Sequence, residues 1–537
     1  MEGNPNMKKP STERGSMRLK LATIMAVLAL IAAACGSTVD SVTDAAGDAA
    51  DAAGDVADDA ADAVTGDDGD DAEEEPEAEE EPEAEEEPEA EEEPEAEDGG
   101  DDAAAADTTI TGEFADDEIT VAIVGNPTME DIVALTPEFF TDVGGPAVNY
   151  VTLEEQTLRE IVSVDVAVGA GDFDAVMIGP FEAPQFGANG WLTDLSDAVD
   201  SDPAYDSADL IPAVRGALST DDGFFALPFY AESSFIMFNQ QIMDDAGITV
   251  PAAPTWEEIA DIARQVDTDD VSGICLRGLP GWGDFGASLT TVVNTFGGTW
   301  WEANADGSVG EAQINGEDSG FRAAFNFYND LLADAGQDDP ATSSFPQCLE
   351  LLQQGQTAMW YDATVAAGIL EGDDSPLQGN LGVALAPTAE IDTPSGWLWS
   401  WALAVPVNSP NPDAAIEYAK WATSAQYIQT AGVNAPGGWA AAPPGTRVST
   451  YSIPEYQDAA ESFADLTLSA IQGVDPTNPG TTPRPGLPGV QYVGIPEFQA
   501  VGTACTTELA EVLSGSATVD EALDACQAIA AEVTVDG

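Results

Sequence analysis

Apolar and polar positions follow two different periods from Glu118 onward, and this predicts strands interleaved with helices. Short apolar runs typical of buried strands lie at EITVAIV (118–124), AVNYVTL (147–153) and FDAVMIG (173–179). Between the second and third runs, LREIVSVDVAVGAG (158–171) repeats its apolar residues at helical spacing. Because strands that alternate with helices pair in parallel, we expect an open α/β sheet.

Polar and aromatic residues directly follow two of these predicted strands. Asn126 and Pro127 come after the first strand, and Phe181 and Glu182 come after the third. Ligands of open α/β sheets bind outside the carboxyl ends of the strands. Asn126, Phe181 and Glu182 are therefore candidate ligand-binding residues.

The segment FALPFYAESSFIMFNQ (225–240) places five aromatic residues around one glutamate and two serines. Its apolar pattern is that of a buried strand, yet burial of an unpaired carboxylate is costly. The polar residues Glu232, Ser233 and Ser234 therefore need a partner.

The region before residue 113 has a different composition. Residues 36–112 hold 33 acidic and no basic residues, and EEEPEA occurs four times between Glu73 and Ala96. Like charges at this density repel, and few large apolar residues are available for a core. We expect a disordered tether, with cation binding by the glutamates as the alternative.

A short leader precedes this tether. MRLKLATIMAVLALIAAACGS (17–37) has a basic start, an apolar run and small residues before Cys35, which is typical of a bacterial lipoprotein signal. The alternative, a membrane-spanning anchor, needs roughly 20 apolar residues, and only about 15 precede the cysteine. We expect residues 1–35 to form a signal peptide, with lipidation at Cys35 and an extracytoplasmic, membrane-anchored protein.

Charge and composition exclude several classes of function. The chain of 537 residues has no histidine, which removes Ser-His-Asp and Cys-His nucleophiles and His-based zinc sites. We expect no metal and no cofactor. Residues 113–537 hold 64 acidic and 8 basic side chains, and a field of this sign repels nucleic acid and anionic membranes.

Four further cysteines lie in the region after residue 113, and an exported chain favours disulfides. We expect Cys275 to pair with Cys348, and Cys505 with Cys526. The second pair brackets TTELAEVLSGSATVDEALDA, which predicts two helices joined by a Gly-Ser turn. No CxxC spacing is present, which favours a structural role over a redox or metal-binding one.

Several segments, in a characteristic order, carry a resemblance to a known family. They are VMIGPFEAPQFGANGWLTDL, FALPFYAESSFIMFNQQIMDDAGI, PTWEEIADIARQV, LLQQGQTAMWYDATVAAG, LGVALAPT and AVPVNSPNPDAAIEYAKWATS. Over residues 117–535 the chain resembles the extracellular solute-binding proteins of ABC importers, in the carbohydrate-binding group that includes maltose-binding protein. GICLRGLPGWGD, FPQCLELLQQGQTAMWYDAT and GGWAAAPPGTRVSTY are most similar to binding proteins for polyols such as sorbitol and mannitol.

The resemblance implies an α/β fold of two lobes, periplasmic-binding-protein-like, with hinge crossovers and an interlobe ligand cleft. It places one lobe at 117–227 plus 363–425 and the other at 228–362 plus 426–537. It implies a monomer without enzymatic activity that captures a sugar or polyol and delivers it to ABC permease subunits in the membrane.

The hydroxyls of a polyol need fixed hydrogen-bond partners, and its C–H faces stack on flat apolar rings. Carboxylates are strong acceptors, and aromatic side chains are suitable platforms. The sequence supplies both kinds where loops should meet at the cleft. The candidates are Asn126, Phe181, Glu182, Tyr230, Glu232, Ser233, Trp282, Asp284, Asp362, Trp397, Trp399, Trp439 and Arg447.

Some of these assignments have alternatives. Trp397, Trp399 and Trp401 alternate as a strand does, so at least one is expected in the core rather than at the ligand. Arg447 can pair with cleft carboxylates or donate to hydroxyls, or it can pin a loop through an ion pair. For function, the alternatives are a glycosidase with two carboxylates, which needs no histidine, and a surface carbohydrate-binding protein without a transporter.

Overall fold

The computed structural model describes residues 110–304, 308–480 and 488–533. The expected signal peptide, Cys35 and nearly all of the expected tether lie outside the described residues. All further structural statements concern the described ranges, which fall within one compact unit of the chain.

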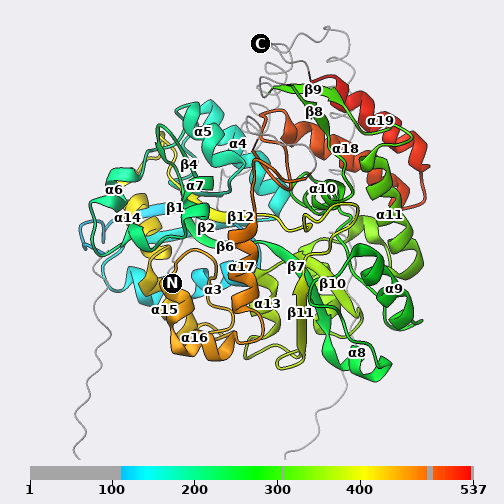
Figure 1. Ribbon diagram of the computed structural model, residues 1–537. Coiled ribbons are helices and arrows are strands. Elements are labelled where there is room, and N and C mark those ends of the chain that lie inside the picture. Colours follow the sequence, from blue (N-terminus) through cyan, green and yellow to red (C-terminus); the bar gives the residue numbers. More distant parts are fainter. Residues whose placement is uncertain (1–109, 305–307, 481–487, 534–537) are drawn as a thin grey trace, which may run out of the picture. The chain divides into compact units, whose positions relative to one another are not determined.

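A five-stranded sheet contains all three strands expected from the first apolar runs (Figure 1). In spatial order it consists of β2 (Ala147–Leu153), β1 (Glu118–Val124), β3 (Ala175–Ile178), β12 (Trp399–Ala404) and β6 (Leu227–Glu232). β1 pairs in parallel with β2 and β3, as predicted. β12 is antiparallel to both β3 and β6, so the sheet is mixed.

A second sheet is antiparallel and has three strands. It consists of β10 (Met359–Ala363), β7 (Ser234–Asn239) and β11 (Leu381–Leu385). Two short ribbons complete the strands: β4 (Ser219–Thr220) with β5 (Gly223–Phe224), and β8 (Trp301–Ala303) with β9 (Val309–Ala312).

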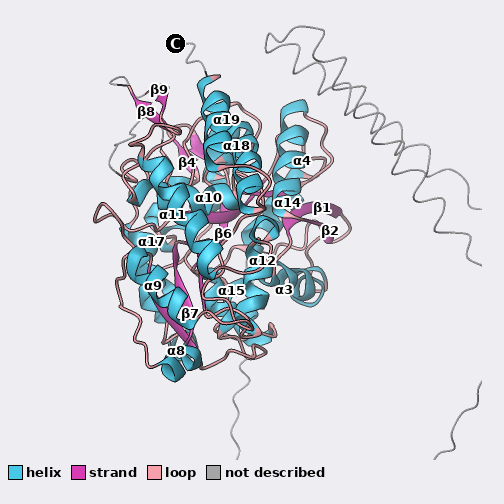
Figure 2. Ribbon diagram, turned by 90° about the vertical axis from the view of Figure 1, so that its right-hand side faces the viewer, coloured by secondary structure: helices cyan, strands magenta, loops and turns pink. Residues whose placement is uncertain are grey.

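Helices surround the strands (Figure 2). Many of the helices begin at side-chain caps. The first group is α3 (Pro127–Thr136), α4 (Glu155–Val168), α5 (Glu182–Ala188), α6 (Ser196–Asp200), α7 (Pro212–Ala217), α8 (Gln240–Ala246), α9 (Trp256–Val266) and α10 (Phe285–Thr295). The second is α11 (Gly320–Ala335), α12 (Phe345–Gln353), α13 (Val365–Leu370), α14 (Pro412–Ala422), α15 (Ala425–Asn434), α16 (Pro454–Ala459), α17 (Ala464–Gly473), α18 (Phe498–Leu513) and α19 (Val519–Ala531). Short helices of other types are η1 (Pro137–Thr141), η2 (Ser207–Asp209), η3 (Pro340–Thr342) and η4 (Ser449–Ser452).

The chain passes from one sheet to the other at Ser233. The expected single strand PFYAESSFIMFN is therefore two strands, with β6 in the first sheet and β7 in the second. Thr364, directly after β10, holds this passage: its backbone N–H donates to the Ser233 carbonyl at 2.8 Å, and its hydroxyl accepts from the Ser233 N–H at 3.2 Å.

The strand pairing also bears on the division into lobes. β11 pairs with β7, which places residues 381–385 in the three-stranded sheet. The expected division assigned 363–425 as a whole to the lobe of the first sheet. The return to the five-stranded sheet lies between the end of β11 and the start of β12.

The four cysteines after residue 113 lie in the two expected pairs. The Cα atoms of Cys275 and Cys348 are 5.6 Å apart, and those of Cys505 and Cys526 are 4.7 Å apart. The second pair joins α18 to α19, the two helices predicted around the Gly-Ser turn. Within the described ranges, no helix combines the length and the apolar character that crossing a membrane requires.

Candidate functional site

A cavity of about 240 Å³ lies where loops from both sheets converge. From the first sheet and its connections come the loop after β1, the start of α4, β6 and β12, together with Trp397 two residues before β12. The loop before α10, the start of α12 and the end of β10 contribute from the second. Its polar and aromatic lining consists of Asn126, Glu154, Glu155, Arg159, Tyr230, Glu232, Arg277, Trp282, Ser344, Phe345, Trp397, Trp399, Trp401 and Gln491.

Arg159 on α4 contacts two carboxylates and three tryptophan rings. Its guanidinium donates to Glu182 at 2.6 Å and to Glu155 at 2.8 Å. The same guanidinium lies 4.3 to 4.8 Å from the ring centroids of Trp282, Trp399 and Trp401. A buried cation paired with carboxylates and stacked on indole rings has a fixed orientation.

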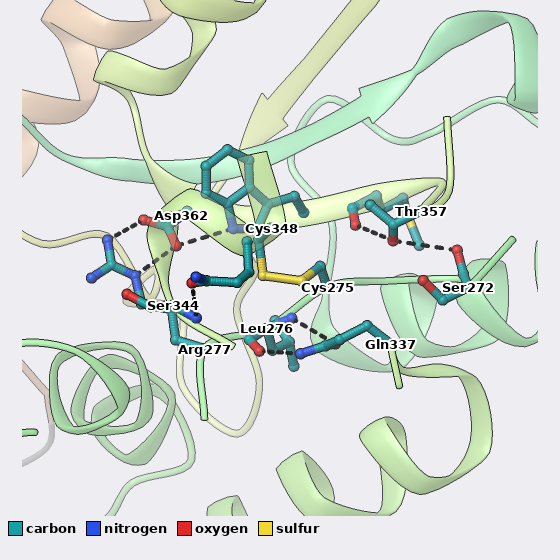
Figure 3. The surroundings of a disulfide bond; sticks show 12 residues. Ser272, Cys275, Leu276, Arg277, Gln337, Ser344, Cys348, Thr357 and Asp362 are labelled. Carbon is teal, nitrogen blue, oxygen red and sulfur yellow. Dashed lines mark hydrogen bonds and ion pairs between the residues drawn. A yellow bond between two sulfur atoms is a disulfide. The ribbon is translucent and has the colours of Figure 1, made fainter. Parts of the chain in front are cut away.

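Arg277 is the second guanidinium at the cavity. It forms a two-pronged pair with Asp362, with nitrogen–oxygen distances of 2.6 and 2.7 Å. Its third nitrogen, Nη1, is 3.7 Å from Asp284 and 3.9 Å from Glu155. Asp362 also accepts from the Trp360 indole at 3.0 Å (Figure 3). Because this geometry is bidentate, the direction in which Arg277 Nη1 points is set by Asp362.

Glu232 at the end of β6 faces the cavity without a cationic partner within ion-pair distance among the described residues. Its side chain is 6 % exposed. Burial raises the pKa of Glu232 to about 8, against the lowering effect of Arg277, while Asp362 and Glu155 add to the rise. Beside it, the Tyr230 hydroxyl accepts from the Asn126 side-chain amide at 3.2 Å.

Asp284 lies behind the lining and titrates in a similar way. Its carboxylate accepts from the Ser344 hydroxyl at 2.5 Å. Burial raises the pKa of Asp284 to about 7, although Arg277 and the Ser344 hydroxyl favour its charged form.

Tryptophan rings form the apolar wall. Trp282 and Trp399 meet edge to face with centroids 6.0 Å apart, and Trp399 meets Trp401 at 5.6 Å. Phe181 packs behind Trp282 at 4.5 Å. The wall therefore presents ring surface to the cavity and is supported by a second row of aromatic residues.

The structure divides the expected site residues into three groups. Asn126, Tyr230, Glu232, Trp282, Trp397 and Trp399 line the cavity. Glu182, Asp284, Asp362 and Phe181 lie one layer behind it and hold lining residues. Ser233, Trp439 and Arg447 lie away from it.

The residues of the third group have other surroundings. Ser233 is the crossing point between the sheets and lines a hollow on another side of the strands. Trp439 lines a shallow surface hollow beside Val433. Arg447 is fully buried, donates to the backbone carbonyls of Thr423 and Asp206, and pins its loop, the alternative considered for it.

Sequence reasoning did not single out the two arginines that dominate the site. Arg159 lies within a helix predicted only from its apolar spacing, and Arg277 lies in the quoted segment GICLRGLPGWGD. The scarcity of basic residues could have identified these two arginines as candidates. Residues 113–537 hold only eight basic side chains, and basic side chains are seldom buried unless they are paired. Glu155, Ser344 and Gln491 carried no comparable signal.

The arrangement suits recognition of hydroxyl groups. Guanidinium nitrogens and carboxylate oxygens alternate around a small cavity, and ring faces cover its apolar side. Fixed donors and acceptors bind vicinal hydroxyls, and aromatic faces stack on C–H surfaces. Among the described residues, no group of three or more acidic or cysteine side chains is placed to hold a metal ion.

Comparisons with known proteins identify the family of the chain. The model of the family described as bacterial extracellular solute-binding protein matches residues 125–429. A mannitol-binding protein of Pseudomonas aeruginosa is 37 % identical over 412 residues, covering 76 % of this chain and 91 % of the relative. An erythritol/L-threitol-binding protein of Mycolicibacterium smegmatis is 25 % identical and covers 54 % of this chain and 64 % of its own.

Solved structures share the fold. The crystal structure of an ABC transporter solute-binding protein from Agrobacterium vitis, with bound D-mannitol, is 39 % identical, covers 77 % of this chain and 97 % of its own, and has a TM-score of 0.73. Maltose-bound MalE3 of T. maritima, at 18 % identity, covers 77 % of this chain and 98 % of its own, with a TM-score of 0.63. The expected two-lobe α/β fold is thereby confirmed. The chain belongs to the bacterial extracellular solute-binding proteins, the extracytoplasmic and non-enzymatic substrate-binding components of ABC importers.

Proposed function

We propose that this chain captures a neutral sugar alcohol of about the size of mannitol and delivers it to an ABC permease. The observation that carries the proposal is the similarity at 37 and 39 % identity to a mannitol-binding protein and to a structure holding D-mannitol. The site supports it, because paired guanidiniums and carboxylates alternate with ring faces around one cavity.

The cavity volume supports a small solute over an oligosaccharide. At about 240 Å³ it is smaller than ligand pockets of roughly 300 to 1,000 Å³ that hold drug-sized molecules. Most of the lining is buried, including the tryptophans and both arginines, whereas Gly125, Glu154 and Pro346 are exposed. A small solute would therefore be held mainly by buried side chains.

Capture proceeds by closure of the two lobes around the solute. In our proposal the lobes follow the two sheets, and the crossings at Ser233 and between β11 and β12 act as hinges. The Glu155–Arg277 contact at 3.9 Å joins residues from the two sides and belongs to the closed form. A solute that contacts both sides binds the closed form better and shifts the population toward it.

The same proposal includes the chain's covalent features. The leader directs export, Cys35 carries a lipid, and residues 36–112 tether a monomeric binding domain to the membrane. Cys275–Cys348 and Cys505–Cys526 form disulfides in the oxidising compartment outside the cytoplasm, supported by their placement in two close pairs.

A melting panel on the full-length protein tests the ligand class. Mannitol, sorbitol, ribitol, glucose, maltose and trehalose are compared at one concentration and one salt level. We expect the largest rise in Tm with a hexitol, since a ligand that binds only the native state stabilises it by mass action. A rise with maltose or trehalose alone would discard the polyol assignment, and no response to any of the six would discard the ligand class altogether.

A further inference from the structure

The buried charges around the cavity do not balance. Two guanidiniums, of Arg159 and Arg277, share one network with five carboxylates. The carboxylates belong to Glu155, Glu182, Glu232, Asp284 and Asp362. Four of the five are nearly inaccessible to water, and Glu155 is 20 % exposed. Buried charges are normally paired, so this site lacks positive charge.

No cation of the described chain is available to make up the difference. Each of its arginines and its lysine already has a carboxylate partner within 4 Å. At the cavity itself, Arg159 is engaged by Glu155 and Glu182, and Arg277 by Asp362. An anionic solute would therefore meet guanidiniums that are already neutralised and carboxylates that repel it.

Glu232 is the point where positive charge is missing. It lines the cavity, is 6 % exposed, and no described cation lies within 4 Å of it. Its neighbours are the Trp397 indole and, at longer range, Arg277, Asp362 and Glu155. Burial, with Asp362 and Glu155 nearby, raises the pKa of Glu232 to about 8, so a proton partly supplies the charge that the site lacks.

We propose that the cavity also takes cationic polyhydroxylated solutes, namely amino-deoxy sugar alcohols, with the ammonium group at Glu232, and that it rejects the corresponding sugar acids. This inference rests on the proposed function, because it assumes that a hexitol skeleton fills the same cavity. The ammonium would supply three donors and the missing charge at one position. The competing arrangement is a protonated Glu232 that donates to a hydroxyl, and it gives no advantage to an amine.

Three ligands with one skeleton and different charges separate these arrangements. D-mannitol, 1-amino-1-deoxy-D-mannitol and D-mannonate are titrated calorimetrically into the full-length protein at pH 7 and constant salt. We expect the amine to bind about tenfold more tightly than mannitol, because its ammonium forms charge-assisted hydrogen bonds with Glu232. We expect mannonate to bind about tenfold more weakly than mannitol, because the cavity carboxylates repel its charge. Titrations in two buffers of different ionisation enthalpy should show proton release with the amine and none with mannitol.

The variant Glu232→Gln should bring the amine-to-mannitol affinity ratio close to one. Glu257→Gln, at an exposed position on α9, is the matched control and should leave this ratio unchanged. If mannitol binds and the amine binds no better, or if mannonate binds as well as mannitol, the inference is overturned while the proposed function stands. If none of the three binds, the proposed function itself fails.

Discussion

At the scale of single residues, Trp399 reaches the cavity because position 179 has no side chain. A Cβ added to Gly179, at the end of β3, would lie 2.0 Å from the Trp399 ring. The ring must then move, and overpacking of this kind costs about 1 to 3 kcal/mol. We predict that Gly179→Ala displaces Trp399 and weakens mannitol binding by roughly tenfold.

Gly216 on α7 provides the matched control, since a Cβ there would meet nothing within 4 Å. Gly216→Ala should keep the wild-type dissociation constant, measured by calorimetry. Unchanged binding by Gly179→Ala would mean that Trp399 contributes nothing to the ligand contact.

Glu232 gives the unliganded protein a pH-dependent stability. The folded state holds the proton up to a pKa of about 8, whereas the unfolded chain releases it near 4.5. The native state therefore binds more protons between these values, and the free energy of unfolding falls as pH rises from about 5 to about 8. Asp284, with a pKa of about 7, contributes a slope of the same sign.

The groups that face Glu232 are Tyr230, Arg277, Asp362, Glu155 and the Trp397 indole. We predict that Glu232→Gln flattens the decline of Tm between pH 5 and pH 8 and leaves the part due to other carboxyls with raised pKa values, such as Asp284 and Asp131. The measurement is thermal unfolding of both proteins at matched ionic strength. A decline equally steep in the variant would show that Glu232 ionises normally in the folded state.

At the scale of elements, one cysteine pair connects two segments of the cavity wall. Cys275 lies two residues before Arg277 and next to Cys348 (Figure 3). Cys348 belongs to α12, whose first residues include the lining side chain Phe345. A bond between them ties the loop of Arg277 to the helix that carries Phe345. Cys505 and Cys526 join α18 to α19 and line no part of the cavity.

We predict different effects for the two pairs when both cysteines are replaced by serine. Each replacement should lower the free energy of unfolding by about 3 to 4 kcal/mol, since the proposed disulfides would close loops of 73 and 21 residues. Only Cys275→Ser with Cys348→Ser should also weaken mannitol binding, because only this cysteine pair connects segments that line the cavity. Equal affinities of the two double variants, measured below both melting temperatures, would contradict this role.

The local pattern of apolar and polar residues predicted some strands correctly and failed to predict others. The runs at 118–124 and 147–153 became β1 and β2 with the predicted limits, because strong apolar periodicity was followed by polar turn residues. The break between β6 and β7 at Ser233 could not be predicted from the sequence. Both strands are buried along their whole length, so their residues have the pattern of one continuous buried strand. The alternation of Trp397, Trp399 and Trp401 indicated a strand, but the antiparallel pairing of β12 could not be predicted, because it depends on residues far away in sequence.

Local sequence pattern likewise predicted some of the site residues and missed others. Residues that follow strands or alternate along them, such as Asn126, Tyr230 and Trp399, were found because their position alone predicts their direction. Arg159 was missed because its role comes from three tryptophans on other elements. The two-lobe fold itself rested on the family resemblance and not on periodicity.

At the scale of the whole molecule, negative charge dominates. Residues 113–537 carry 64 acidic and 8 basic side chains, and the described cations are already paired. The excess carboxylates repel one another, and this repulsion is stronger in the compact state than in the unfolded chain. Screening shortens from about 10 Å at 0.1 M salt to about 3 Å at 1 M.

We predict that raising sodium chloride from 0.1 to 1 M increases Tm by several degrees, as relief of this repulsion requires. As a control, Tm is measured in sucrose at the same osmolarity, because sucrose stabilises proteins by being excluded from their surface without screening charge. A constant or falling Tm in salt, alongside a rise in sucrose, would show that surface repulsion is not a significant term in the stability.

The tryptophans stacked around Arg159 also give the protein an optical property. Three indole rings lie within 4.8 Å of one guanidinium, at the wall that a bound solute would cover. The emission of indole depends on nearby charge and on water, and both change when the cavity fills. Capture of a colourless, unlabelled sugar alcohol can thus be followed by the light that the protein itself emits.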